Sequence, residues 1–335
     1  MASSALVAAA VIAAACERAP DSASSPPQRV ERAAPRAAPA VTAPAPRLEG
    51  AGRWGREGTG DAEFLGPFGV HASAPGRTPA GGGATEVFVA DDLGNSVQVF
   101  DATGRFLRRF GKQGTAPGEF SFPDQVLERE DGKLIVCDTG NNRLQILGRD
   151  GDFIAQRRRW GFLRDQLENP RGAARDGKGR VFVADWGRHR ICVFDEALEF
   201  LAAWGREGQA PGELRRPIGV AVDREGRVFV ADSGNDRVQV FSPDGTVQAD
   251  RSPAAGQLES PASLAFDSQR RLFVADTGSR SLKCFAPTGD LLGAYGRMGS
   301  AQDVLEAPRG IAIDAADRLY IVDTGRHEVR VFQVR

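Results

Sequence analysis

Two arginines and one aspartate in this 335-residue chain occupy equivalent positions of a repeated segment and could together bind an anionic group. Each follows directly after a proline that begins a short apolar strand. Guanidinium groups donate paired hydrogen bonds to carboxylates and phosphates, and apolar neighbours form the walls that are typical of a ligand pocket. Across the six repeats, the residues at this position are Phe68, Asp124, Arg171, Ile218, Ala262 and Arg309. We predict that the site for a ligand or partner is formed by Phe68, Asp124, Arg171, Ile218 and Arg309.

These positions favour binding over catalysis. None of the six is a histidine, cysteine or lysine, so no pair of nucleophile and base is evident among them. We therefore assign no catalytic residue and expect a site for a carboxylate, a phosphate or the acidic side chain of a partner. The alternative interpretation is that the charged residues pair with one another across a solvent-filled channel.

A second set of carboxylates recurs at intervals of 47, 47, 47, 44 and 47 residues. Calcium takes about six to eight oxygen ligands, so six aspartates could suggest a metal. However, one aspartate in each repeat gives six symmetric positions rather than one site. An arginine stands five positions later in three repeats. We interpret each aspartate as a cap of its own turn, and we predict no metal and no other cofactor. The six residues are Asp91, Asp138, Asp185, Asp232, Asp276 and Asp323.

A period of this length, with short strands and glycine turns in each unit, is the pattern of a β-propeller. One unit reads as three strands over 219–241 followed by an outer fourth strand. The last unit stops after its third strand at 329–332, whereas residues 54–58 repeat residues 204–208, which follow a fourth strand. We therefore predict an all-β, six-bladed propeller with four antiparallel strands per blade. Residues 47–55 are expected to complete the last blade and remove two exposed sheet edges.

The turns 138–143 and 232–237 resemble the Asp-Thr-Gly-Asn-Asn-Arg turn of NHL repeats, and 217–223 and 308–314 match the Pro-x-Gly-(Val/Ile)-Ala-(Val/Ile)-Asp strand. The resemblance covers residues 47–335 and implies the same six-bladed fold. NHL-like propellers include RNA binders, protein-binding sensor domains and the lyase that completes peptide amidation. For that lyase, the resemblance would place zinc-binding histidines directly after the inner-strand prolines, where this chain has none.

The three histidines of the chain do not suggest a zinc site. His189 and His327 occupy the turn position of Asn142, and we interpret them as turn residues. His71 belongs to an inner strand of another repeat. A zinc site needs three or four nitrogen or sulfur ligands that converge at about 2 Å, and these histidines come from three different repeats.

An RNA partner would need a basic face that carries stacking side chains. The best candidate is the pair Arg108 and Arg109 together with 157–160, on two neighbouring outer strands. Alternate arginines on a strand point in opposite directions. In addition, 43 basic and 44 acidic side chains nearly cancel. We predict no nucleic-acid partner.

The N-terminus is typical of an exported protein. Residues 6–15 are an apolar run that ends at Ala13-Ala14-Ala15-Cys16, similar to the lipobox of bacterial lipoproteins, which implies lipid attachment at Cys16. No Lys or Arg precedes the run, and alanine replaces the commoner leucine at position 13. The segment 17–46 holds seven prolines and is predicted to be a disordered linker. The predicted organisation is a signal peptide over 1–16, this linker, and a propeller over 47–335.

Cysteine use and two irregular segments complete the sequence picture. We expect Cys137 and Cys284 in the core, and Cys192 facing outward because it aligns with glutamines. An insertion over 74–84 is interpreted as a hairpin loop beside the predicted contact surface. Blade 4 lacks the aromatic-glycine pair that ends other outer strands.

Together, these features predict a bacterial, non-catalytic propeller that binds a protein or peptide. It is expected at the cell envelope, facing the periplasm or exterior, in contact with membrane only through its lipid, and with a monomeric body. A secreted protein is the alternative for location. The alternative function is a metal-dependent hydrolase or lyase that uses channel residues, either peptide-amidating-lyase-like or calcium-dependent-lactonase-like.

Overall fold

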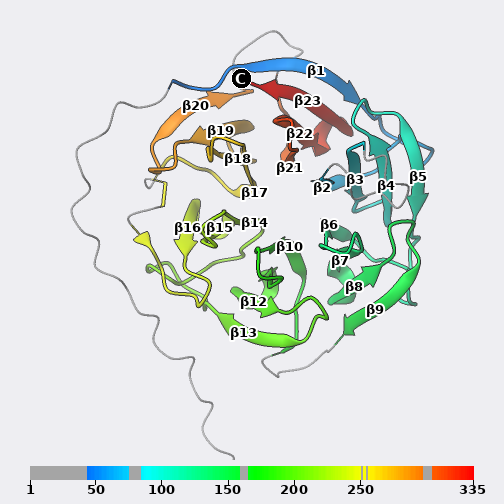
Figure 1. Ribbon diagram of the computed structural model, residues 1–335, viewed down its shortest axis with the longest axis horizontal. Coiled ribbons are helices and arrows are strands. Elements are labelled where there is room, and N and C mark those ends of the chain that lie inside the picture. Colours follow the sequence, from blue (N-terminus) through cyan, green and yellow to red (C-terminus); the bar gives the residue numbers. More distant parts are fainter. Residues whose placement is uncertain (1–43, 75–83, 159–164, 250–251, 254–255, 297–303) are drawn as a thin grey trace, which may run out of the picture.

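The computed structural model describes residues 44–74, 84–158, 165–249, 252–253, 256–296 and 304–335. These residues form six antiparallel sheets that are arranged radially around a central axis (Figure 1). The predicted all-β, six-bladed propeller is therefore confirmed. The predicted signal peptide and all but residues 44–46 of the predicted linker lie outside the described residues.

Each blade runs from an inner strand at the axis to an outer strand at the rim. Blades 1 to 3 consist of β2 (Pro67–Ala72), β3 (Glu86–Asp91), β4 (Ser96–Asp101) and β5 (Phe106–Phe110); β6 (Pro123–Glu128), β7 (Leu134–Asp138), β8 (Arg143–Leu147) and β9 (Phe153–Arg158); and β10 (Pro170–Arg175), β11 (Val181–Asp185), β12 (Arg190–Phe194) and β13 (Phe200–Trp204). Blades 4 to 6 consist of β14 (Val220–Val222), β15 (Val228–Asp232) and β16 (Arg237–Phe241); β17 (Pro261–Phe266), β18 (Leu272–Asp276), β19 (Ser281–Phe285) and β20 (Leu291–Tyr295); and β21 (Pro308–Ile313), β22 (Arg318–Asp323), β23 (Glu328–Val334) and β1 (Leu48–Trp54).

The N-terminal strand β1 closes the ring as predicted. It pairs antiparallel with the C-terminal strand β23, from Leu48 opposite Val334 to Trp54 opposite Val329. The Trp54 ring also lies 5.6 Å from the ring of Phe100 in blade 1. The closing strand therefore completes the sheet of blade 6 and joins that blade to blade 1.

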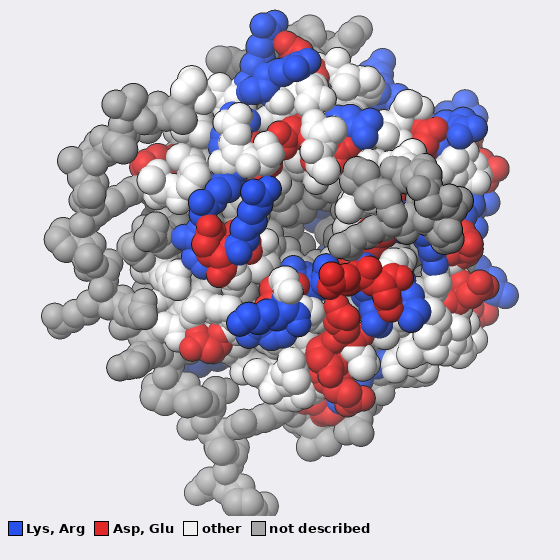
Figure 2. Space-filling view, viewed as in Figure 1, with Lys and Arg blue, Asp and Glu red and all other residues white. Residues whose placement is uncertain are grey.

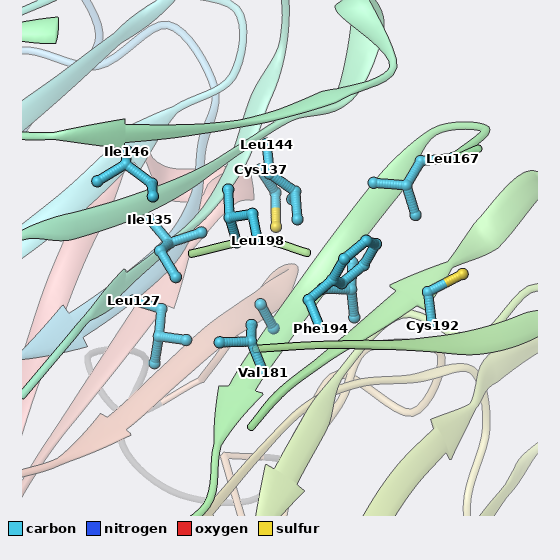
Figure 3. Close-up of a cluster of buried hydrophobic side chains, with 12 residues drawn as sticks. Leu127, Ile135, Cys137, Leu144, Ile146, Leu167, Val181, Cys192, Phe194 and Leu198 are labelled. Carbon is cyan, nitrogen blue, oxygen red and sulfur yellow. The ribbon is translucent and has the colours of Figure 1, made fainter. Parts of the chain in front are cut away.

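The hydrophobic core lies between neighbouring blades. Figure 3 shows one such cluster, in which Leu127 and Ile135 of blade 2 and Val181 and Phe194 of blade 3 take part. Because each blade is covered on both faces, every residue of β11 and of β15 is buried. Strands covered on both faces read as continuous apolar runs, which explains the recurring phrase Val-Phe-Val-Ala-Asp.

The expected outward orientation of Cys192 is wrong. Its side chain is buried, and its Sγ lies 3.6 Å from Oδ2 of Asp185. The aligned side chains of Gln98, Gln145 and Gln239 are buried as well. The reason is that the preceding blade and the segment that leads into the inner strand cover this face of each sheet. Cys137 and Cys284 are buried as predicted, and all three thiols are free.

The recurring aspartates hold their own turns, as predicted, and they also bind a segment outside the turn. In blade 2, Asp138 Oδ1 accepts a hydrogen bond from the backbone N–H of Ser121 at 2.7 Å. Its Oδ2 accepts from Arg143 Nε at 2.6 Å and from Gln145 Nε2 at 3.1 Å. The side chain accepts no N-cap hydrogen bond from the short 3₁₀ turn η1 (Thr139–Asn141) that it precedes, but it accepts from Asn141 Nδ2 within that turn at 3.1 and 3.0 Å. The aspartate thus fixes the segment that enters the inner strand of its own blade.

Blade 4 differs from the others at its outer edge. Within the described residues its sheet has three strands, and a single bridge between Phe241 and Val247 stands where the fourth strand would begin. Elsewhere an outer aromatic packs on a turn glycine of the next blade, as Trp204 does on Gly245. The sequence of blade 4 has no such aromatic, which agrees with the shortened sheet.

The strand ends that flank the 74–84 insertion lie at the opposite end of blade 1 from the expected contact surface. Residues 75–83 of the insertion are outside the described part of the chain. Strands β2 and β3 place Pro67 opposite Asp91 at one end and Ala72 opposite Val87 at the other. The flanks of the insertion are at the second end, whereas Phe68 is at the first. The predicted position of the loop itself concerns residues outside the described part of the chain.

Candidate functional site

A cavity of about 310 Å³ follows the axis of the ring and is lined by the inner strands. The sequence-predicted site residues all contribute to its wall, so the structure brings the whole predicted set together. They come from blades 1, 2, 3, 4 and 6 and are Phe68, Asp124, Arg171, Ile218 and Arg309. We call the end of the cavity at which these residues begin their strands the channel mouth.

Glycines next to the mouth residues explain why the inner strands approach one another closely. A Cβ on Gly310 would collide with the carbonyl oxygen of Phe68, and a Cβ on Gly172 with that of Ile218. The N–H of Gly172 donates to the Ile218 carbonyl at 2.9 Å. The Pro-x-Gly pattern therefore serves close backbone contact between blades, which crowds the side chains at position x together.

Two arginines flank one phenylalanine at the mouth. The guanidinium carbons of Arg309 and Arg171 lie 5.2 and 5.5 Å from the centre of the Phe68 ring. Arg171 Nη1 pairs with Asp124 Oδ2 at 3.0 Å. Arg309 has no carboxylate within ion-pair distance among the described residues, and its buried Nε has no hydrogen-bond partner there. We call Arg309, Phe68 and Arg171 the clamp.

Two carboxyl groups lie beside the clamp and do not simply neutralise it. Burial raises the pKa of Asp124 to about 7, although Arg171 opposes the shift and the charge of Asp92 adds to it. Burial likewise raises the pKa of Asp92 to about 6. The Oδ1 atom of Asp92 is buried without a hydrogen-bond partner. Near neutral pH the two groups together carry less than two negative charges, so the clamp keeps a net positive charge.

Sequence reasoning missed Asp92, although a signal for it existed. In four blades the residue after the recurring aspartate is Ser or Thr, and its hydroxyl donates to the carbonyl of the next inner-strand proline. We call this bond the hydroxyl clasp; two examples are Thr139 to Pro170 at 2.6 Å and Thr324 to Pro67 at 2.5 Å. The other two donors are Ser233 and Thr277. In blades 1 and 3 the residue is Asp92 or Trp186, neither of which carries this hydroxyl.

Trp186 extends the clamp toward the rim of the mouth. The guanidinium carbon of Arg171 lies 5.2 Å from its ring, and that of Arg216 lies 5.1 Å from it. Arg216 is exposed and has no carboxylate within ion-pair distance among the described residues. Arg309, Phe68, Arg171, Trp186 and Arg216 thus alternate as cation and aromatic ring, and we call this row the ladder. Rings attract cations through their quadrupole, which holds the guanidiniums without neutralising them.

The histidines lie apart from one another. His189 and His327 occupy left-handed turn positions with φ of 56° and 53°, in agreement with the predicted turn role. His71 lines the cavity, and its Nε2 lies 3.8 Å from Glu128 Oε2. In the part of the chain that the structure describes, no group of three or more His, Cys, Asp or Glu could hold a metal.

The basic residues that suggested a nucleic-acid face are paired where the structure describes them. Arg108 pairs with Glu86 at 2.7 Å and Arg157 with Asp165 at 2.9 Å. Residues 159 and 160 lie outside the described residues. On the face seen in Figure 2, acidic and basic side chains are interspersed around the central hollow. This distribution gives no extended positive surface for a polyanion.

Comparison with known proteins identifies the repeat. A family model described as NHL repeat matches residues 167–194, 214–241 and 305–332, and one described as 6-bladed beta-propeller matches residues 84–159. The protein is an NHL-repeat β-propeller. No curated protein matches the sequence.

Solved structures similar to this NHL propeller have diverse functions. One is a streptogramin B lyase, with a TM-score of 0.59 and 12% identity over 87% of this chain and 98% of the other. Another is a gluconolactonase from Xanthomonas campestris, with a TM-score of 0.60 and 15% identity over 88% and 99%. A third, from Bacteroides thetaiotaomicron, has unknown function, a TM-score of 0.63 and 13% identity over 87% and 76%. At such identities the likeness shows the fold alone.

Among the described residues, no helix has the length and apolar character needed to cross a membrane.

Proposed function

We propose that this NHL propeller is a non-catalytic binding protein whose channel mouth captures an acidic group of a protein or peptide partner. The observation that carries the proposal is the clamp. Two guanidiniums lie on one ring, and one of them, Arg309, has a buried donor without a partner among the described residues. Leaving such a donor unpaired is costly, and a carboxylate from outside would satisfy it.

The size of the site supports a side chain or chain terminus as the entering group. The cavity of about 310 Å³ is at the lower end of the ~300–1,000 Å³ that ligand pockets span. It can hold one or two side chains, while a folded partner stays outside on the rim. Burial of the clamp lowers the local dielectric constant, which strengthens a charge pair that forms there.

The second candidate function is an enzyme, and one observation favours it. A carboxyl group with a pKa of about 7 suits general acid or base chemistry near neutral pH. The clamp would then orient an anionic substrate beside Asp124. If an enzymatic turnover is found and Asp124→Asn abolishes it while anion binding persists, this candidate replaces the binding protein.

The same proposal includes display at the cell envelope by a lipid on Cys16. The support is the sequence Ala13-Ala14-Ala15-Cys16 followed by the proline-rich segment. Mass spectrometry of the protein from its native host should find a diacylated Cys16 at the N-terminus. An intact Met1 would exclude the anchor.

Selection from a random peptide display library tests the clamp. The wild-type propeller should enrich peptides that share an acidic residue or a free C-terminal carboxylate, because these groups fit the clamp. Arg309→Gln should lose this enrichment. Arg109→Gln, on the exposed rim, is the matched control and should keep it. Enrichment without an acidic consensus, or an unchanged consensus with Arg309→Gln, would contradict the proposal.

A further inference from the structure

The ladder does not end at the clamp, and its outer half has no role in holding the fold together. We infer that Trp186 and Arg216 form a second acidic subsite, so that the preferred partner segment carries two acidic groups. This inference rests on the proposed function, because the first acidic group is the one held by the clamp.

The repeat separates the backbone role of Arg216 from its side chain. In four blades the residue before the inner-strand proline has left-handed backbone, with φ between 49° and 52°. Its N–H donates to a side chain of the preceding blade, as Arg216 does to His189 Nδ1 at 2.9 Å and Ser260 does to Asp236 Oδ1 at 2.7 Å. The backbone bond therefore does not require an arginine. Across the six blades the residues at this position are Gly66, Phe122, Asn169, Arg216, Ser260 and Ala307.

Trp186 departs from the repeat at the same blade junction. Four other blades have Ser or Thr there, and they use it for the hydroxyl clasp. Blade 3 instead presents an indole to Arg171 on one side and Arg216 on the other. The junction between blades 3 and 4 is thus one at which an indole replaces the hydroxyl and an arginine precedes the next inner-strand proline.

The charge at this junction is open to an external anion. Two acidic groups near this junction face other cations: Glu207 lies 3.9 Å from His189 Nε2, and Glu168 lies 3.6 Å from Arg188 Nε. Arg171 is already paired with Asp124, whereas Arg216 has no ion pair among the described residues. An indole holds a guanidinium by its face and leaves the N–H edge free to donate. Arg216 therefore lies ready for a carboxylate or phosphate at the rim.

The spacing of the ladder limits how the two acidic groups are arranged. Arg171 and Arg216 each lie about 5 Å from the same indole, hence no more than about 10 Å apart, a distance an extended chain covers in ~3 residues. Arg309 is separated from Arg171 by the Phe68 ring and lies further from Arg216 along the ladder. A segment with acidic residues at positions i and i+3 can thus reach both subsites.

Short blocked peptides test this inference by isothermal titration calorimetry. The probes are the acetylated amides of Glu-Gly-Gly-Glu, Glu-Gly-Gly-Gln and Gln-Gly-Gly-Glu. The wild-type protein should bind the diacidic probe about tenfold more tightly than either monoacidic probe, as one added charge-assisted hydrogen bond predicts. Arg216→Gln should lose this advantage and retain the monoacidic affinity. Trp186→Thr should also lose the advantage, and it should weaken the monoacidic probes slightly because the indole packs on Arg171 as well. Arg309→Gln should weaken all three.

The outcomes distinguish this inference from the proposed function. If the monoacidic probes bind but the second glutamate adds nothing, or if its gain persists in Arg216→Gln, the second subsite is refuted and the clamp stands. If no probe binds the wild-type protein, both are refuted. Trp186→Thr restores the residue that other blades use at this position, so the variant should fold, and circular dichroism checks this.

Discussion

The six blade junctions of this propeller fall into two kinds. In four of them a hydroxyl clasp joins the turn after the recurring aspartate to the next inner strand. In the junctions after blades 1 and 3, Asp92 or Trp186 takes the place of the hydroxyl. Asp92 lies beside the clamp and Trp186 lies within the ladder, whereas the clasped residues share a hydroxyl that donates to the backbone of the next blade.

This difference shows where the repeat serves the fold and where it serves the site. A hydroxyl that donates to a buried carbonyl stabilises a junction. Its replacement by a half-buried carboxyl group or a half-buried indole gives up that bond and adds charge or an aromatic surface at the mouth. Functional sites commonly carry such a stability cost. Four predictions test whether the two kinds of junction differ in this way.

The largest effect is expected from a recurring aspartate in comparison with Asp92. Asp138→Ala leaves the fully buried guanidinium of Arg143 without its carboxylate and should lower the free energy of unfolding by about 3–5 kcal/mol. Asp92→Ala removes a carboxyl group that has a buried oxygen without a partner, so it should lower the free energy of unfolding far less than Asp138→Ala does. Urea denaturation measures both. Equal losses would show that Asp92 is structural.

Asp124, at the junction that lacks a clasp after blade 1, should make the free energy of unfolding depend on pH. The folded pKa of Asp124 is raised to about 7 from 3.8, so between these values the native state binds more protons than the unfolded chain. This contribution to stability is complete below pH 4 and is lost as the pH rises through about 7. Relative to Asp124→Asn, the wild type should lose up to about 4 kcal/mol from pH 4 to 8, at about 1.36 kcal/mol per unit.

Denaturation of both proteins over this pH range measures the difference between them. Thr139→Ser, at a clasped junction, is the control and should follow the wild-type profile because a hydroxyl does not titrate in this range. Parallel profiles for the wild type and Asp124→Asn would contradict the assignment of a raised pKa to Asp124.

Removal of a clasp should have a smaller effect. Thr139→Val or Thr324→Val keeps the shape of the side chain but leaves a proline carbonyl without its donor, which should cost about 1–2 kcal/mol. The same denaturation experiment applies. Peptide binding should remain unchanged in Thr324→Val, and a loss of binding in this variant would contradict the division between the two kinds of junction.

Introduction of a clasp should have the smallest effect and the opposite sign. Asp92→Thr places a hydroxyl where it can reach the carbonyl of Pro123, the equivalent of the acceptors in other blades. The expected gain is about 1 kcal/mol in the free energy of unfolding at pH 8, where the carboxylate is also most costly to bury. A thermal melt that moves downward would contradict this expectation.

The sequence was sufficient to predict the six-bladed ring and the residues that line its channel mouth. The spacing of the prolines assigned Phe68, Asp124, Arg171 and Arg309 to equivalent strand positions, and a closed ring must bring such positions together. The incomplete last repeat also predicted that the strand over 48–54 would pair with the C-terminal strand. These inferences depend only on repeat length and register, which sequence carries directly.

The remaining features depend on packing that a single repeat does not reveal. Cys192 faces inward because a neighbouring blade covers it, and alternation along one strand cannot show this. Strand direction puts the flanks of the 74–84 insertion at the other end of blade 1 from Phe68, which the repeat pattern alone does not show. The sequence shows that Asp92 and Trp186 replace the Ser or Thr of other repeats. It does not show that this Ser or Thr bonds the next blade, and that bond is what makes the replacement significant.

The most direct test of the clamp is NMR of the arginine Nε–H groups while acetyl-Glu-Gly-Gly-Glu amide is added to saturation. We predict that the resonances of Arg309 and Arg171 shift, because the carboxylate binds between them. The resonance of Arg143, which is fully buried in blade 2, should stay in place. A saturated complex in which the Arg309 resonance does not move would contradict the account.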